Sequence, residues 1–188
     1  MKARTDTKEK IVALGADLMK SIGYPSLSYQ QISSQLGIKN AAIHYHFPSK
    51  EDLGRDIVHS DQVYFENIIS GMFDLNPWEK LEAFLTRYRG HLEADNKICM
   101  IGTTASDFQE LPKSVQKAGE EYLVVVMNWF IALLNEGRTQ GVFHFKGKAE
   151  SKAAVMVSAL AGALQHARLI GNDHYFSVEN QLKEDLKE

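Results

Sequence analysis

Residues 27–47 have the sequence LSYQQISSQLGIKNAAIHYHF, and this stretch decides the fold. Ser28 followed three residues later by Gln31 is a capping box, in which each residue satisfies a free backbone N–H of the other. A helix is therefore expected to begin near Tyr29. Gly37 supplies the left-handed residue that ends a helix, and a second apolar face follows it. The stretch predicts two short helices joined by a tight glycine turn.

Two short helices at a tight turn are typical of a helix-turn-helix, whose second helix enters the major groove of DNA. Ile38, Ala42 and Ile43 have the spacing to face inward from the second helix. The other side chains are hydrogen-bonding groups, a cation and an aromatic, the types that reach phosphates and base edges. The alternative is an αα-corner inside an all-helical enzyme. The residues expected to face outward are Lys39, Asn40, Ala41, His44, Tyr45 and, at the edge of this face, His46.

Composition indicates a globular protein in the cytoplasm. The chain has 188 residues, of which 44% are hydrophobic, enough for one domain or two small ones. No run approaches the roughly 18 to 20 apolar residues of a membrane span, and the first twenty residues lack an apolar signal core. The single cysteine, Cys99, suits a reducing compartment. We therefore expect no membrane association.

The charge distribution favours a DNA partner, although the net charge is −3. Residues 1–55 hold eight Lys and Arg against five Asp and Glu, an excess of three positive charges. The remaining residues, 56–188, therefore carry an excess of six negative charges. A basic first part and an acidic second part suit a protein that presents one end to a polyanion.

Further helices are expected on both sides of the opening stretch. A first helix should run over 7–22 and end at Gly23, with Gly15 inside it to allow close packing against a neighbouring helix. Ser49 and Asp52 form a second capping pattern, so a fourth helix should start there and run towards residue 70. Its start, beside Lys50, suits an anion such as a DNA phosphate. The expected apolar stripe of the first helix is Ile11, Leu14, Leu18 and Ile22.

Residues 7–58 resemble the N-terminal domain of TetR/AcrR-type transcriptional regulators, and the ending Tyr45-His46-Phe47-Pro48-Ser49-Lys50-Glu51 is the most specific part of the match. The resemblance implies an all-α homodimer with a three-helix DNA-binding domain, residues 1–55, and a larger helical domain for ligand binding and dimerisation, residues 56–188. It also implies repression of a palindromic operator that a small-molecule inducer relieves.

By position, the resemblance assigns phosphate contacts to Ser28, His44 and Lys50, with Tyr29 as a further backbone contact. Base or groove contacts are assigned to Lys39, Asn40, Ala41 and Tyr45. His44 stands where the family usually has tyrosine, and Lys39 where Ser or Thr often caps the helix, so base preference does not transfer. Packing is the expectation for Phe47 and an open alternative for Tyr45.

The rest of the chain is expected to be helical. Helices are predicted from 76 onwards, over 99–108, 113–138, 150–170 and 177–186, from their apolar spacing. The helix at 150–170 is rich in Ala and Gly, which lets a second helix approach closely. We assign it and the 177–186 helix to the dimer interface, as a four-helix bundle. The alternative is an Ala-rich core helix within a monomer.

The resemblance places the inducer site in the second domain, and the candidates there are aromatic, thioether and polar side chains. Cys99 follows residues 95–97, where a helix start and Lys97 would activate a thiol. It therefore raises a second hypothesis, a thiol sensor of electrophiles or oxidants, beside that of a plain buried cysteine. A DNA-binding regulator without a small ligand also stays open. No catalytic motif or metal-spaced cluster is present, so we expect no enzyme, cofactor or metal. The candidate ligand residues are Arg87, His91, Cys99, Met100, Phe108, Tyr122, Met127, Trp129 and His166.

Overall fold

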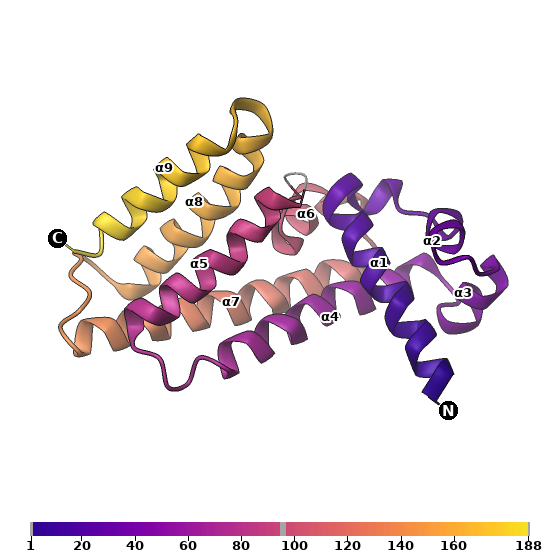
Figure 1. The fold of residues 1–188 in the computed structure, drawn as a ribbon, viewed down its shortest axis with the longest axis horizontal. Helices are drawn as coiled ribbons and strands as arrows, with labels where there is room; N and C mark the ends of the chain where they lie inside the picture. The colour runs from indigo at the N-terminus through magenta and orange to yellow at the C-terminus, as the bar shows by residue number, and fades with distance from the viewer. Residues whose placement is uncertain (1, 95–96, 188) are drawn as a thin grey trace. The chain divides into compact units, whose positions relative to one another are not determined.

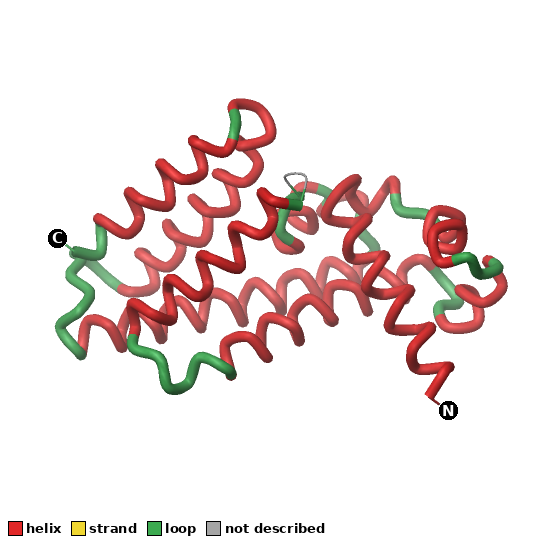
Figure 2. Tube along the Cα trace, in the orientation of Figure 1, coloured by secondary structure: helices red, strands yellow, loops and turns green. Residues whose placement is uncertain are grey.

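The chain is all-helical over the residues that the structure describes. The structure is a computed structural model, and it describes residues 2–94 and 97–187, with side chains from residue 6 onward. Helices joined by loops make up this part of the chain, and one isolated β-bridge links His144 to Lys187 (Figures 1 and 2). The all-α class predicted from the sequence is confirmed.

The helices in chain order are α1 (Lys2–Ser26), α2 (Tyr29–Leu36), α3 (Asn40–His46), α4 (Lys50–Ser70), α5 (Pro77–Glu93), α6 (Met100–Ser106), the 3-10 turn η1 (Phe108–Glu110), α7 (Lys113–Thr139), α8 (Ala149–Ile170) and α9 (Asn172–Glu184). They divide between two compact units. The first unit comprises Met1–Phe65 and Met100–Tyr122, and the second comprises Glu66–Cys99 and Leu123–Glu188. Both α4 and α7 run from the first unit into the second.

The buried face of α1 differs from the predicted stripe. Ile11 and Met19 are fully buried, whereas Leu14 and Leu18 are only half-buried and Ile22 is 42% exposed. The predicted stripe and the buried row, which contains Ile11, Gly15 and Met19, both have helical spacing. Periodicity therefore does not show which of the two rows is buried. The choice depends on which row the neighbouring helices cover, and this is a tertiary property.

Two glycines shape α1 as the sequence predicts. A Cβ built on Gly15 would lie 2.6 Å from Cδ1 of Ile57, so glycine lets α1 and α4 approach closely. Gly23 has φ +80° and interrupts the regular helix, after which one more turn continues to Ser26. The next residue, Tyr24, donates its backbone N–H to the carboxylate of Asp107 at 2.8 Å. The end of α1 is thereby tied to the turn between α6 and η1.

In the second unit, local signals set where the helices begin. Asn76 caps α5 through a capping box with Glu79, and Pro77 occupies its first turn. Helix α9 begins at Asn172, five residues before the predicted start at Ser177. The reason is Gly171, which has φ +93° and turns the chain directly from α8 into α9.

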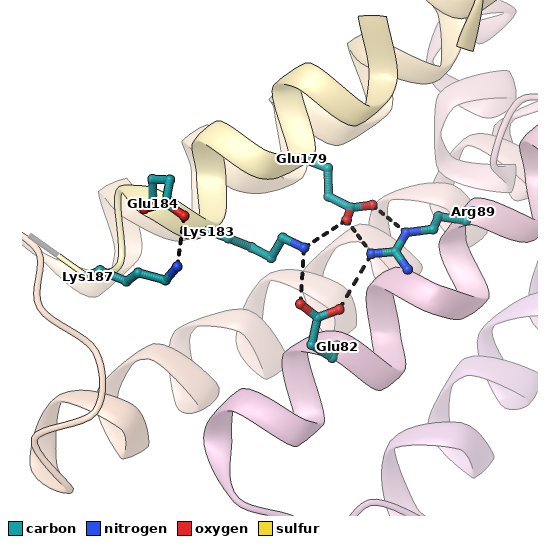
Figure 3. A network of polar contacts seen from close by, with 6 residues as sticks. All are labelled: Glu82, Arg89, Glu179, Lys183, Glu184 and Lys187. Carbon is teal, nitrogen blue, oxygen red and sulfur yellow. Dashed lines mark hydrogen bonds and ion pairs between the residues drawn. The ribbon is translucent and has the colours of Figure 1, made fainter. Parts of the chain in front are cut away.

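A network of charged side chains joins α9 to α5 within this unit (Figure 3). The side chain of Glu179 is 2% exposed and accepts two hydrogen bonds from Arg89, one of them 2.8 Å from Nε to Oε2. Lys183 lies 3.3 Å from Glu179 and 3.1 Å from Glu82. Burial acts to raise the pKa of Glu179, but the hydrogen bonds and charges of Arg89 and Lys183 outweigh it and lower that pKa. Glu179 is therefore a charged, fully bonded group inside the unit.

We predict that Arg89→Met lowers the free energy of unfolding by about 2 kcal/mol, because it leaves a buried carboxylate with fewer partners. Urea unfolding followed by circular dichroism measures the change. Arg87→Met is the matched control, since Arg87 lies on the same helix and is exposed. Equal effects of the two substitutions would show that the network does not hold α9 to α5.

Candidate nucleic-acid interface

The helix pair α2 and α3 is set by the local signals that the sequence predicts. The Ser28 hydroxyl accepts the Gln31 backbone N–H at 3.3 Å, and the Gln31 side chain accepts the Ser28 backbone N–H at 2.9 Å. Gly37 adopts φ +65° and ψ +30°, the left-handed conformation that ends α2. Ile38 then donates its N–H back to Ser33 at 3.0 Å. The predicted capping box and glycine turn are both confirmed.

Helix α3 presents a polar face outward from a buried base. Ile43 is fully buried and Phe47, just after the helix, is 1% exposed, as expected for core residues. Tyr45 is 60% exposed, and its ring meets the His46 ring edge-on with centroids 5.2 Å apart. The other exposed residues of this face are Lys39, Asn40, Ala41 and His44. These five exposed residues, 39–41, 44 and 45, are called the α3 face below.

Tyr29 contacts the α3 face from its buried side, a role that the sequence did not predict. Its hydroxyl donates to the Phe47 backbone oxygen at 2.8 Å, and its ring meets the His44 ring edge-on with centroids 4.7 Å apart. Burial, together with the carboxylate of Asp52, raises the pKa of Tyr29 to about 12. The hydroxyl thus stays protonated and bonded to the chain, and the ring fixes the position of His44.

The start of α4 has the predicted cap, but Lys50 makes a bond within the chain that the sequence did not indicate. Ser49 and Asp52 form the predicted cap, with the Ser49 hydroxyl donating to Asp52 Oδ2 at 2.7 Å. The Lys50 ammonium donates to the Pro25 backbone oxygen at 2.9 Å and lies 4.6 Å from the centre of the Tyr24 ring. Partial burial lowers the pKa of Lys50. An ammonium has three donors, so Lys50 can hold this turn and still reach an anion.

The predicted ligand residues are divided between the two compact units. Arg87 and His166 are exposed, whereas Cys99, Met100 and Tyr122 are buried. The expected helix start just before Cys99 falls at residues 95–96, which lie outside the described residues, and α6 begins after Cys99. The first unit holds Met100, Phe108 and Tyr122, and the second holds Arg87, His91, Cys99, Met127, Trp129 and His166.

Within the second unit, two of the candidates lie in a cluster of aromatic rings. Phe84 lies 5.4 Å from Trp129, and Tyr88 lies 5.4 Å from His91, measured between ring centroids. Tyr175, which the sequence did not single out, stacks at 6.4 Å on Tyr88. Its hydroxyl is buried and has no hydrogen-bond partner within the described part of the chain. Tyr175 is 87 positions from Tyr88, so no local sequence pattern links the two residues.

Comparison with known proteins agrees with this geometry. Residues 11–57 match the family model of bacterial regulatory proteins, tetR family. A TetR transcriptional regulator from Legionella pneumophila is 31% identical, with 96% of this chain and 97% of that chain covered, and has a TM-score of 0.83. The chain belongs to the TetR family. A TetR-family transcriptional regulator from Agrobacterium tumefaciens is 27% identical over 98% of this chain and 100% of that chain, with a TM-score of 0.92. A search of curated proteins found no match.

Membership of the TetR family indicates the role of the helix pair α2 and α3. The matched region of this TetR-family chain contains α2, α3 and most of α1, so the α3 face belongs to a helix-turn-helix of a DNA-binding transcriptional regulator. The chemistry of that face is hydrogen bonding and positive charge, as DNA recognition requires.

We predict that Gly37→Ala lowers the free energy of unfolding by about 1 kcal/mol, because alanine pays a steric cost in the left-handed conformation. No atom lies within 4 Å of a Cβ built on Gly37, so the effect comes from the backbone alone. Gly37→Asn is the control and should cost less, since asparagine tolerates this conformation. Thermal or urea unfolding of the two variants compares them, and equal losses would contradict the backbone explanation.

Proposed function

We propose that this protein is a dimeric transcriptional repressor that binds a palindromic operator and releases it when a small-molecule inducer binds. The observation that carries the proposal is the α3 face, five exposed residues held on a buried base of Ile43 and Phe47. We assign DNA reading to residues 1–55 and ligand binding with dimerisation to residues 56–188. The place of action is the cytoplasm.

Within the DNA-reading part, the assignments follow donor type and exposure. Lys39, Asn40, Ala41 and Tyr45 face outward from the start and outer side of α3, and we assign them to bases and groove. Ser28, His44 and Lys50 are assigned to phosphates. Tyr29 contributes by holding His44, since its own proton is bonded to Phe47.

The dimer face is assigned to α8 and α9. By length and composition alone, α8 is apolar enough to cross a membrane, a test that core helices of soluble proteins also pass. Only 33% of its most apolar window is buried within this chain. The exposed apolar side chains on these two helices include Val155, Leu169, Ile170 and Phe176. A second copy of the chain would cover this surface and make a four-helix bundle.

Dimerisation explains how an inducer acts without touching DNA. Two α3 helices must reach successive major-groove faces, roughly 34–36 Å apart, and this requires a near-palindromic operator. A ligand that binds better to a subunit geometry with another spacing shifts the population away from DNA. The aromatic cluster around Phe84 and Trp129 is the place we assign to the inducer. The buried, unbonded hydroxyl of Tyr175 supports an inducer that carries a polar group.

The DNA assignment predicts that Lys39→Ala and His44→Ala each weaken operator binding about tenfold, as for loss of one good contact. The Lys39 side chain makes no capping bond in the fold, so its removal tests DNA contact alone. Footprinting on DNA that flanks the gene finds the operator, and fluorescence anisotropy at several salt concentrations measures affinity. Loss of one phosphate contact lowers the salt slope by about one.

The control for these variants is Lys146→Ala, an exposed lysine of the second unit, which should bind like wild type. If His44→Ala and Lys50→Ala both left the affinity unchanged, the phosphate assignments would be wrong. A screen of small molecules for release of the bound operator then tests the inducer separately.

The dimer assignment predicts that Val155→Glu converts the protein to a monomer, because an unpaired charge buried in an interface costs several kcal/mol. Sedimentation velocity measures the mass, and operator binding should weaken in parallel. Phe73→Glu is the matched control: Phe73 is 86% exposed but lies outside α8 and α9. A dimeric Val155→Glu protein would place the interface elsewhere.

A further inference from the structure

Two histidines meet where α8 turns into α9. His166 lies near the end of α8 and His174 in the first turn of α9, on opposite sides of Gly171. Nδ1 of His166 and Nε2 of His174 are hydrogen-bonded at 3.2 Å, so one nitrogen donates the proton that the other accepts, and the ring centroids are 5.3 Å apart. A metal ion bound by both nitrogens would take the place of this proton. His166 is exposed and His174 is half-buried within the chain, so an ion can reach the pair from solvent.

The separation of the two nitrogens fits the coordination of a single metal ion. Imidazole nitrogens bind zinc at about 2.0–2.1 Å, and tetrahedral angles then place two of them about 3.3 Å apart. The terminal torsion of histidine is soft, so small ring rotations can direct both lone pairs at one point. We propose that His166 and His174 together bind one divalent transition-metal ion of the zinc, nickel and copper class.

The chemistry of the pair explains this choice of ion. Neutral imidazole suits zinc, copper and nickel, whereas calcium and magnesium prefer oxygen ligands. Within the described residues, no set of three or more His, Cys, Asp or Glu side chains comes together to hold a metal. The remaining coordination positions are therefore open to water, and the ion exchanges with solvent. An ion held by one residue from each helix cross-links α8 and α9 across their turn.

Sequence spacing did not indicate this site. His166 and His174 are eight residues apart, and neither forms a helical pair with a histidine three or four positions away. The positive φ of Gly171 reverses the chain between them and brings the rings together. The site is independent of the operator and of the proposed inducer, so it adds a second chemical input to the chain.

The test uses full-length protein without a histidine tag, stripped with a chelator and dialysed. Isothermal titration with Zn²⁺, and separately with Ni²⁺, should show saturable binding of one ion per chain. His166→Ala and His174→Ala should each weaken binding about tenfold or more, since even outer-sphere partners of a metal are worth 10- to 100-fold. His59→Ala and His144→Ala, which remove exposed histidines elsewhere, should bind like wild type.

A second measurement identifies the ligands directly. In ¹⁵N-histidine NMR spectra, Zn²⁺ should shift the ring resonances of two of the seven histidines. The same spectra show whether each alanine variant is folded. Absence of saturable binding by the wild-type protein, or wild-type affinity in both pair variants, would overturn the proposal.

Discussion

The arrangement of the helix-turn-helix depends on one constraint, which is the short length of α3. A helix of seven residues is too short to be stable by itself in water, so its position must come from contacts outside it. Ile43 and Phe47 supply burial, and the Tyr29 hydroxyl holds the carbonyl of Phe47. The left-handed Gly37 sets the direction from which α3 departs. The α3 face is therefore held from its buried side, and its five residues stay exposed to solvent.

In the second unit, the C-terminal helix α9 is held in place by contacts with other helices. Helix α9 packs against α8, buries Tyr175 and Leu182, and forms ion pairs with α5 through Glu179 and Lys183. A buried ion pair is weak evidence of stability, because desolvation offsets much of the attraction. Its advantage is direction: the carboxylate fits only where the Arg89 guanidinium can bond it, and this fixes the register of α9 against α5.

Local signals were read correctly from the sequence because each is complete within a few residues. The caps at Ser28 and Ser49 and the turn at Gly37 involve partners three or four positions away, and all formed as expected. The misplaced features depend on partners distant in sequence. Which row of α1 is buried depends on α4, and the early start of α9 depends on the backbone of Gly171.

The difference between local and distant partners also applies to the α3 face and to the second unit. Exposure of the α3 face follows from helix periodicity once Ile43 is buried, so the sequence could name its residues. Arg89 and Glu179 are ninety positions apart, and no spacing rule joins them. The nine candidate ligand residues were chosen by type alone, and they fall in both compact units. Residue type alone does not show which side chains the fold brings together at a site.

Helix α8 illustrates how one sequence pattern can serve two packing demands. A helix packed on one side shows a single apolar stripe, whereas a helix that is apolar all round must be covered on every side. Residues such as Leu160 and Leu164 are buried inside the unit, while Val155 on the same helix is 55% exposed. A helix that contacts its own chain with one face and a second copy with the other therefore reads as uniformly apolar. The proposed dimer interface would account for a composition that resembles a membrane span.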